Sequence, residues 1–326
     1  MPNKVTHIYC ILGADMFLLD FAGPISPFLF ARQFGIDIEF HFISPCASLP
    51  LMPPLGYGPR IEGIEPMPDE IGKDDIVMVY GAHNTEVAMA APMSDEIIEW
   101  LRHKTHKDQR IISVCIGALL LAKAGLLKGK YCTTFYSRLD DLARYSPSAK
   151  TCANQIFVHD GNILTSAGIT TGIDAALYFV ELTWGAELAF RIAREMVVYH
   201  RRQGSDVQLS PYLAHRNHVD DKLHKAQDLI CHNPQNSWTA EIIAAEIGMS
   251  ARHLVRKFSE ITQTSLAKYI QNIRLSYAKR LMQNKAKSLE DVAFESGIGT
   301  TRSLRRLWHE HFDDTPYNWR KKMARE

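Results

Sequence analysis

"IISVCIGALLLAKAGLLKGK", residues 111–130, places a cysteine between an apolar run and a helical one. Residues 111–114 are typical of a short buried strand, and residues 117–123 are typical of the first turns of a helix. A nucleophile at such a sharp strand-to-helix turn is how several hydrolase families expose a reactive atom. The stretch therefore predicts an α/β fold with Cys115 at a turn, and it makes a cysteine enzyme the first hypothesis to test.

The chain on either side of this stretch alternates between strand-like and helical patterns from residue 5 to about residue 200. The strand-like runs lie at residues 5–12, 38–44, 74–80, 110–115 and 156–166, the last being a hairpin that turns at Asp160–Gly161. The helical runs lie at residues 23–35, 94–105, 171–184 and 187–202, with Ser94 as the expected N-cap of the second. This alternation predicts a parallel sheet covered by helices on both faces, an α/β domain of flavodoxin-like type.

Composition and cysteine usage predict a cytoplasmic protein without a cofactor or metal. The 326 residues suffice for two domains with separate cores. No apolar run approaches the ~18 residues that a membrane span needs, and the N-terminus lacks the pattern of a signal peptide. The six cysteines form no C-x-x-C pair and no metal-like spacing with histidine, so reduced thiols are expected. His103 and His106 are interpreted as a solvated helix end rather than a metal site.

Charge is divided unevenly along the chain. Residues 221–326 hold 18 Lys and Arg against 12 Asp and Glu, whereas the remaining residues hold 19 against 24. Residues 203–220 lose periodicity and contain Gly, Ser and Pro, which is typical of a connection. A basic module joined to a mildly acidic one is typical of a nucleic-acid-binding protein with a second function, although chance imbalance would look the same. We therefore expect a domain at 1–202, a linker at 203–220 and a basic domain at 221–326.

Two segments of the basic domain match each other. Thr239, Glu241, Ala244, Glu246 and Gly248 lie 49 residues before Ser288, Glu290, Ala293, Glu295 and Gly297. After a one-residue slip, Arg252, Leu254, Arg256 and Glu260 lie 50 residues before Arg302, Leu304, Arg306 and Glu310. Each copy has the pattern of a cap, a short helix, a glycine turn and a longer helix, which predicts an all-α domain with two helix-turn-helix motifs. Apolar residues at every third or fourth position of 266–281 predict one long helix that holds the two copies in fixed relation.

The longer helix of each copy is expected to bury one face and expose a basic one. Leu254 and Phe258 are one turn apart and should face the core, as should Leu304 and Trp308. The predicted DNA-contacting residues are Ser250, Arg252, His253, Arg256 and Lys257 in the first copy and Thr301, Arg302, Arg305 and Arg306 in the second. A plain helical bundle would also leave solvated arginines. Two motifs in tandem nevertheless favour binding of double-stranded DNA, because the arginine fork can hydrogen-bond guanine bidentately in the major groove.

Residues 239–320 resemble the DNA-binding domain of the AraC/XylS transcription regulators. The resemblance is carried by "IAAEIGMSARHLVRKFSEIT" (243–262), "YIQNIRLSYAKRLM" (269–282) and "LEDVAFESGIGTTRSLRRLWHEHFDDTPYNWR" (289–320). It implies seven helices, of which two recognition helices enter successive major grooves. Two departures, Ile298 where the family usually has Phe and Asp313–Asp314 where glycine and an apolar residue are usual, imply a weaker second recognition helix.

The N-terminal part resembles a second family. The stretches "LLDFAGP" (18–24), "SVCIGALLLAKAGLLKGK" (113–130) and "TSAGITTGIDAAL" (165–177) are similar to the class I glutamine-amidotransferase-like superfamily, in the branch with PfpI proteases and isonitrile hydratases. Together the two resemblances are those of the GlxA subfamily of AraC regulators. In that superfamily an acid on the first crossover helix faces the elbow cysteine, and Asp20 occupies the matching position.

The residues expected around Cys115 argue against turnover. A helix N-terminus is expected to lower the pKa of its thiol, but a nucleophile also needs a base and an oxyanion site. Three departures from the family affect these needs: Ile116 replaces a histidine, Phe135–Tyr136 occupy a stretch that often carries one, and a glycine pair has become Gly81–Ala82. We therefore predict a ligand pocket rather than an enzyme, lined by Asp20, Gly81, Ala82, Cys115, Ile116, Phe135 and Tyr136.

The favoured interpretation is a bacterial regulator in which a small-molecule effector alters how the helical domain engages a promoter. A helix N-terminus accepts a carboxylate, Asp20 supplies a negative charge and two aromatic rings can face a cation, which together favour a small zwitterion such as an amino acid or a betaine-like quaternary amine. The alternative is that Phe135 and Tyr136 simply pack in the core and that the pocket is of the default, largely apolar kind. A homodimer is expected, with Leu188, Ile192 and Met196 of residues 186–200 as a contact surface or as ordinary cover for the sheet. RNA polymerase is a further candidate partner. The rival interpretations are an isonitrile-hydratase-like enzyme with a DNA-binding appendage and a redox sensor that uses oxidation of Cys115.

Overall fold

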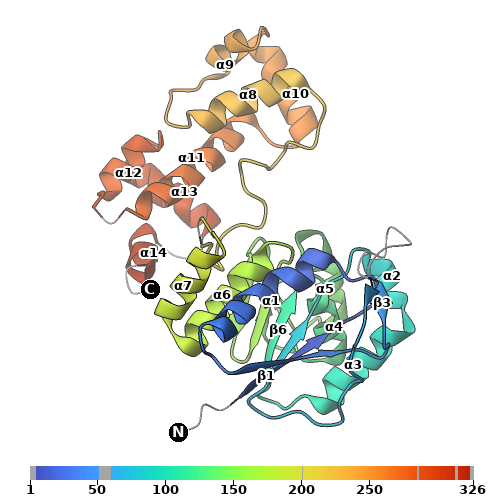
Figure 1. Ribbon diagram of the computed structural model, residues 1–326. Coiled ribbons are helices and arrows are strands. Elements are labelled where there is room, and N and C mark those ends of the chain that lie inside the picture. Colours follow the sequence, from blue (N-terminus) through green and yellow to red (C-terminus); the bar gives the residue numbers. More distant parts are fainter. Residues whose placement is uncertain (1–4, 51–59, 200, 285, 313–314, 324–326) are drawn as a thin grey trace. The chain divides into compact units, whose positions relative to one another are not determined.

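The computed structural model describes residues 5–50, 60–199, 201–284, 286–312 and 315–323. The chain forms two compact units, Met1–Gln208 and Leu209–Glu326, called here the α/β unit and the helical unit (Figure 1). The side-chain amide of Gln208 donates hydrogen bonds to the carbonyl oxygens of Thr134 and Gln155, each at 2.9 Å. The first part of the expected linker thus packs on the α/β unit, and the division falls after residue 208.

The α/β unit is built on a six-stranded sheet with the strand order β2-β1-β5-β6-β10-β9. These strands span Thr6–Ile11 (β1), Ile38–Ile43 (β2), Ile76–Val79 (β5), Arg110–Val114 (β6), Phe157–Asp160 (β9) and Ile163–Ser166 (β10). Neighbouring strands are parallel except β9 and β10, which form an antiparallel hairpin through Gly161 at a φ of +65°. Two small two-stranded sheets pair Leu49–Pro50 (β3) with Arg60–Ile61 (β4) and Tyr131–Cys132 (β7) with Lys150–Thr151 (β8). The predicted sheet and hairpin are confirmed.

Helices cover both faces of this sheet. Every residue of β5 and of β10 is buried, whichever face its side chain points to, so neither face of the central strands is open to solvent. The helices are Leu18–Gln33 (α1), Thr85–Ala90 (α2), Pro92–Lys104 (α3), Gly117–Ala124 (α4), Leu139–Tyr145 (α5), Thr171–Trp184 (α6) and Ala186–Glu195 (α7), with a 3-10 turn at Tyr136–Arg138 (η2). Helix α1 packs on α6 and α7, and α4 packs on α3 and α5. None of the described helices is both long and apolar enough to cross a membrane.

Two helix starts differ from the expected ones. Helix α1 begins at Leu18, five positions before the predicted start, and it carries Pro24 and Pro27 inside its span. Helix α3 begins at Pro92, whose fixed backbone angle suits a first helical position, so the prediction that Ser94 is the N-cap was wrong. Ser94 is buried in the first turn, where its hydroxyl donates to the carbonyl of Ala88 at 2.6 Å.

The described part of the helical unit contains seven helices, as the resemblance implied. They span Asp221–His232 (α8), Ala240–Glu246 (α9), Ala251–Thr262 (α10), Leu266–Met282 (α11), Leu289–Glu295 (α12), Thr301–His311 (α13) and Pro316–Met323 (α14). Two separate cores form within this unit, and α11 contributes to both: Tyr269 and Ile273 to the first, and Leu275 and Met282 to the second. The prediction of one long helix that links the two motifs is confirmed.

The two motifs repeat each other in three dimensions. Thr239 and Ser288 cap α9 and α12, and Ser250 and Thr300 cap α10 and α13, each with a side-chain oxygen that accepts a backbone N–H. Left-handed glycines close both short helices, Gly248 at a φ of +64° and Gly297 at +75°. The second turn holds one more residue and a second left-handed glycine, Gly299 at +95°, which accounts for the one-residue slip in the repeat.

Candidate functional site

Cys115 lies at the turn between β6 and α4, in the position that the sequence predicted. Its φ is +56°, a left-handed conformation that residues with a side chain seldom adopt. The backbone is held from two sides: the N–H of Cys115 donates to the carbonyl of Ser166 at 3.0 Å, and the Thr134 hydroxyl donates to the carbonyl of Cys115 at 2.8 Å. Strained residues persist where the surroundings fix them, and such places cluster at functional sites.

Glycines enclose the side chain of Cys115. A Cβ atom at Gly168 would lie 2.8 Å from Cys115 Sγ, and a Cβ atom at Gly81 would lie 2.6 Å from Cys115 Cβ and 2.8 Å from Asp20 Oδ2. Real Cβ atoms do not approach other atoms so closely, so both positions require glycine. The side chain of Cys115 is therefore packed closely against Gly81 and Gly168, and Cys115 is only 6% exposed.

Asp20 supplies the polar partner of the thiol. The carboxyl group of Asp20, 1% exposed, is hydrogen-bonded to the side chain of Cys115 and accepts the backbone N–H of Ile169. Ile169 itself has a φ of +54°, which is exceptional for a β-branched residue. The predicted facing of Asp20 and Cys115 is therefore present, and the pair is bound to a second strained turn, which follows β10.

Burial dominates the electrostatics of this pair. It raises the pKa of the Cys115 thiol well above its usual range, and the nearby Asp20 charge adds to the rise, while the Ile116 backbone N–H opposes it. Burial also raises the pKa of Asp20, against its hydrogen bonds from Ile169 and Cys115. The expectation that the helix N-terminus lowers the pKa of the thiol was wrong. Burial destabilises the thiolate at this closed turn by more than the backbone N–H at the start of the helix stabilises it. A neutral thiol is a poor nucleophile.

A small cavity lies beside the pair. Gly81, Ala82 and Ile116, all predicted pocket residues, line it together with Ala88 and Met89 of α2. Its volume is about 20 Å³, which is enough for about one water molecule. Any larger ligand at this place requires the surrounding elements to separate.

The remaining predicted pocket residues lie on the segment after β7. The ring centroids of Phe135 and Tyr136 are 4.6 Å apart with an interplanar angle of 53°. Phe135 is half-buried against the core, and Tyr136 is 45% exposed. The preceding residue, Thr134, holds the Cys115 carbonyl, so this aromatic pair is joined directly to the elbow.

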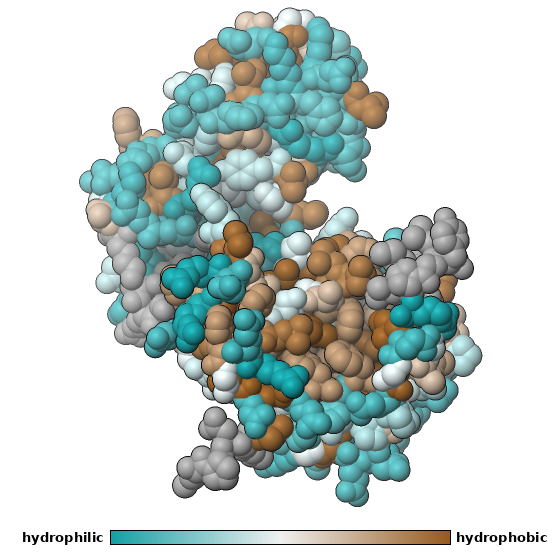
Figure 2. Space-filling model, viewed as in Figure 1, coloured by the Kyte–Doolittle hydropathy of each residue, from teal (hydrophilic) through white to brown (hydrophobic). Residues whose placement is uncertain are grey.

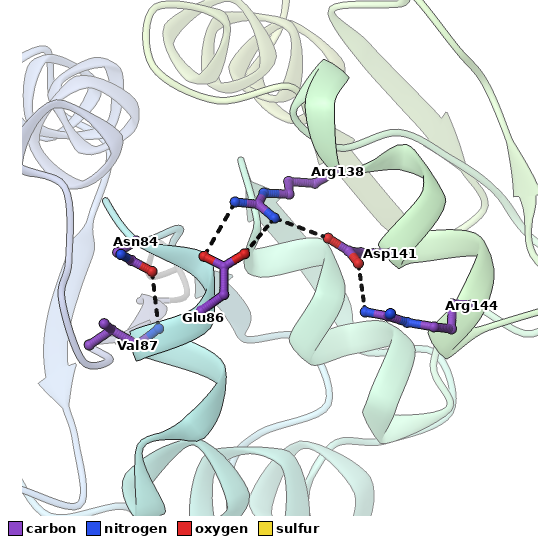
Figure 3. A network of polar contacts seen from close by, with 6 residues as sticks. All are labelled: Asn84, Glu86, Val87, Arg138, Asp141 and Arg144. Atoms are coloured by element: carbon purple, nitrogen blue, oxygen red, sulfur yellow. Dashed lines mark hydrogen bonds and ion pairs between the residues drawn. The ribbon is translucent and has the colours of Figure 1, made fainter.

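An ionic network connects α2 to this aromatic segment (Figure 3). Arg138 of η2 donates to Glu86 of α2 at 2.9 Å and to Asp141 at 3.4 Å, and Arg144 binds the same Asp141 at 2.6 Å. The Asn84 side chain caps α2 by accepting the N–H of Val87 at 3.1 Å. Glu86 and Arg138 were not predicted, since two charged residues distant in sequence carry no local signal of a contact.

The recognition helix of the first motif presents a basic face. Arg252, His253 and Arg256 of α10 are exposed, and Arg256 Nη1 lies 3.1 Å from Glu260 Oε1 one turn away. Ser250 is the N-cap, and its hydroxyl accepts the N–H of His253. Lys257 differs from the other predicted contact residues, because its half-buried ammonium forms an ion pair with Asp220, the N-cap of α8.

The second recognition helix repeats this arrangement. Arg302, Arg305 and Arg306 of α13 are exposed, and Arg306 Nη1 lies 3.1 Å from Glu310 Oε1, matching Arg256 and Glu260. The residue equivalent to Ser250 is Thr300, whereas the predicted contact residue Thr301 is a half-buried first residue of the helix. Ile298, one departure from the family, packs partly buried against the second core, and Asp313–Asp314 lie outside the described residues.

Comparison with known proteins identifies both units. Residues 243–322 match a helix-turn-helix domain, and residues 69–182 match the DJ-1/PfpI family. The HTH-type transcriptional regulator GbdR of Pseudomonas aeruginosa is 27% identical over 261 residues, which are 78% of this chain and 69% of that protein. The HTH-type transcriptional regulator CdhR of the same species is 22% identical over 301 residues, 92% of this chain and 87% of that protein.

An enzyme is similar to a shorter part of the chain. The isonitrile hydratase of Pseudomonas putida is 32% identical over 115 residues, which cover 35% of this chain and 48% of the enzyme. GbdR and CdhR, whose matches are longer than either unit of this chain, are regulators, which agrees with the interpretation of the chain as a DNA-binding regulator and not an enzyme.

Proposed function

We propose that this chain, in which a DJ-1/PfpI domain precedes an AraC-type helix-turn-helix domain, is a one-component transcriptional regulator whose α/β unit binds a small-molecule effector beside Cys115. The observation that carries the DNA-binding half of the proposal is the repeated basic face: Arg252 and Arg302, and Arg256 and Arg306, occupy equivalent exposed positions on two capped helices. Both helices pack on α11, so their spacing is fixed within the helical unit. Two recognition helices in fixed relation suit successive turns of one face of the double helix.

The effector half of the proposal rests on the closed elbow. A thiol with a raised pKa, paired with a carboxyl group and sealed by Gly81 and Gly168, favours ligand sensing over nucleophilic turnover. Because the adjoining cavity holds about one water molecule and is lined by Ala88 and Met89 of α2, a larger effector would enter by displacing α2, and we propose that it moves away from the segment that carries Phe135 and Tyr136. The Glu86–Arg138 ion pair joins those two elements, so it would open as the effector enters.

The chemistry of these groups favours a zwitterion. A carboxylate on the effector can replace Glu86 on the Arg138 guanidinium, which offers a planar fork of donors. The neighbouring Phe135 and Tyr136 rings can face a cationic ammonium group. We therefore propose an amino acid or a betaine-like quaternary amine as the effector class.

A homodimer and contact with RNA polymerase complete the proposed regulator, which would act at promoters in the cytoplasm. The stripe of Leu188, Ile192 and Met196 packs inward against the core, which favours its role as internal cover over its role as a contact surface, and Phe190 is an exposed large apolar residue of α7. Figure 2 shows hydrophobic side chains on the face of the α/β unit around α1, where Leu29 is 48% exposed. This face is the better candidate for the contact between subunits.

The decisive experiment measures ligand and DNA binding on the full chain. Selection from a random duplex pool should yield a preferred DNA sequence, and calorimetry should detect glycine betaine, carnitine or an amino acid that changes the affinity for that sequence. Turnover of an isonitrile or amide without an effect on DNA binding would instead support the enzyme. Binding of an uncharged metabolite, with no response to any zwitterion, would overturn the proposed effector class.

A further inference from the structure

A cluster of metal-ligating side chains lies at the edge of the sheet, on strands β1 and β2. The parallel register places His7 of β1 opposite Glu39 of β2, and His41 lies two residues farther along β2. Residues two apart on a strand point to the same face, so the three side chains share one face of the sheet. One ligand atom of each lies within 4.8 Å of the others.

The distances within the cluster are those of a metal's coordination shell. His7 Nδ1 lies 3.1 Å from His41 Nε2 and 3.6 Å from Glu39 Oε2. Zinc bound by nitrogen and oxygen ligands at about 2.0–2.1 Å in a tetrahedron separates neighbouring ligand atoms by about 3.3 Å. These two separations lie on either side of that value, and the third, between the Glu39 carboxylate and His41, is within 4.8 Å, so an ion can enter if the exposed Glu39 side chain moves toward His41.

The His41 ring is already oriented for this role. Its other nitrogen, Nδ1, lies 3.1 Å from Glu65 Oε2, and a carboxylate that accepts Nδ1–H leaves the Nε2 lone pair free to face His7. Metal-binding histidines commonly have such a carboxylate partner. The Tyr9 ring stacks on the His41 ring with centroids 4.7 Å apart.

The partner Glu65 is also fixed in place by the backbone. The N–H of Glu65 donates to the carbonyl of Phe42 at 2.7 Å, and the N–H of Ser44 donates to the carbonyl of Glu65 at 3.1 Å. Both contacts attach the Glu65 segment to the end of β2, the strand that carries Glu39 and His41. The ligands and their outer partner therefore belong to one rigid edge.

The cluster is also open to an entering ion. Strand β2 is the terminal strand of the sheet, and the side chains of His7 and Glu39 are 35% and 59% exposed. We propose that His7 Nδ1, His41 Nε2 and a Glu39 carboxylate oxygen bind Zn²⁺, with Glu65 as the outer partner of His41 and solvent in the remaining position. Zinc sites with three protein ligands keep the fourth position for water or another small ligand. This site is separate from the Cys115 elbow in its residues and does not depend on the proposed effector.

The test is zinc titration of the full, reduced, metal-free chain by calorimetry and by competition with a chromophoric chelator. The wild-type chain should bind one Zn²⁺ that His41→Ala and His7→Ala do not retain. Glu65→Gln should weaken binding by about 10- to 100-fold, the usual effect of losing an outer partner. Glu39→Gln should also weaken zinc binding. Because the Glu39 side chain is exposed, this variant should fold normally and tests the site even if the histidine variants misfold.

The matched control is His103→Ala. His103 is an exposed histidine on α3 whose Nε2 lies 3.1 Å from Glu99 Oε2, so it offers a histidine–glutamate pair without a second histidine. Its removal should leave zinc affinity unchanged. Cobalt in place of zinc should give a spectrum without the strong sulfur-to-metal band that a cysteine ligand produces. Equal zinc affinity in wild type, Glu39→Gln and His41→Ala, or a sulfur-to-metal band, would overturn the proposal.

Discussion

The buried carboxyl group of Asp20, on α1, is hydrogen-bonded to the side chain of Cys115, at the turn between β6 and α4. This contact joins the first crossover helix to the elbow, and through Ile169 it reaches the turn after β10. The Asp20 charge is one cause of the raised thiol pKa, second to burial. Removing that charge therefore separates the two causes.

Asp20→Asn should lower the pKa of the Cys115 thiol relative to wild type while leaving it above its usual range, because burial remains. The measurement is the pH dependence of Cys115 alkylation, followed by mass spectrometry, with Cys115→Ser to identify the labelled peptide. A midpoint that does not move to lower pH in Asp20→Asn would contradict the assigned role of the carboxylate.

Two other buried thiols, those of Cys10 and Cys132, should make the folded chain less stable at high pH. Burial raises the pKa of Cys10 to about 12, and burial together with the nearby Cys152 and Asp160 charges raises that of Cys132 to about 12. A thiol in the unfolded chain ionises near pH 8.5, whereas these two thiols stay protonated in the folded chain until about pH 12. Neither group changes the free energy of unfolding below about pH 8.5. Above it, each lowers that free energy by about 1.4 kcal/mol per pH unit.

Cys10→Ala should accordingly show a shallower loss of stability above pH 9 than wild type. Its lost packing shifts stability equally at every pH, so the slope isolates the thiol. Urea unfolding of the α/β unit within the full chain, followed by Trp fluorescence between pH 7.5 and 10.5, measures both slopes. Parallel slopes in wild type and variant would refute the argument.

The glycine at residue 168 should be irreplaceable for a steric reason in addition to a backbone one. Gly168 and Gly35 have similar φ values, +91° and +97°, but a Cβ at Gly168 meets the Cys115 side chain, whereas a Cβ at Gly35 has nothing within 4 Å. Both alanine variants carry the strain of a left-handed residue, about 1–2 kcal/mol. Gly168→Ala should cost about 1–3 kcal/mol more, as overpacking does. Equal losses in thermal or urea unfolding would show that the elbow can relax around a methyl group.

DNA recognition should depend on the exposed arginines and not on the basic residue beside them. Arg252→Ala and Arg256→Ala should each cost about 1–3 kcal/mol of DNA affinity and relax sequence preference, if these side chains read bases. Arg302→Ala and Arg306→Ala should relax it less, as the family departures imply. Lys257→Ala is the matched control on the same helix, because its ammonium is engaged with Asp220 and its loss should reduce stability instead of specificity. Selection profiles for each variant, with affinities at two salt concentrations, measure these effects, and greater loss of discrimination in the second helix would reverse the ranking.

Features that depend on a local pattern of residues were predicted correctly from the sequence. Short stretches of sequence were enough to predict the repeat from Thr239 to Glu310, the turn at Cys115 and the hairpin at Gly161. Each of them lies where it was expected. The start of α3 was misplaced because Ser94 is a good cap by type, while Pro92 just before it decides the first turn. The thiol pKa was misjudged because burial is a property of the assembled fold: Gly81 and Gly168 come from loops far from Cys115 in the chain.

Contacts between strands and helices that are distant in the chain could not be predicted from the sequence, because they too depend on the assembled fold. His7 and His41 carry no metal-like spacing, and only the register of β1 with β2 brings them together. Glu86 and Arg138 are likewise ordinary charged residues in the sequence, and only the folded chain brings α2 and η2 side by side.

The Glu86–Arg138 pair yields the prediction that tests the effector chemistry. If an effector carboxylate replaces Glu86 on Arg138, Glu86→Gln should raise the affinity for betaine or an amino acid, because the competing carboxylate is gone. Arg138→Gln should lower the same affinity. Choline, which has the quaternary ammonium but lacks the carboxylate, should respond to neither change.

Arg144→Gln is the control for that series, since Arg144 binds Asp141 and is not joined to Glu86 in Figure 3. Calorimetric titration of the four chains with betaine and with choline gives the comparison. A betaine affinity that is the same in wild type, Glu86→Gln and Arg138→Gln would place the effector carboxylate elsewhere. The N-terminus of α4, which follows Cys115, would then be the next candidate donor for it, because the first backbone N–H groups of a helix lack partners within the helix.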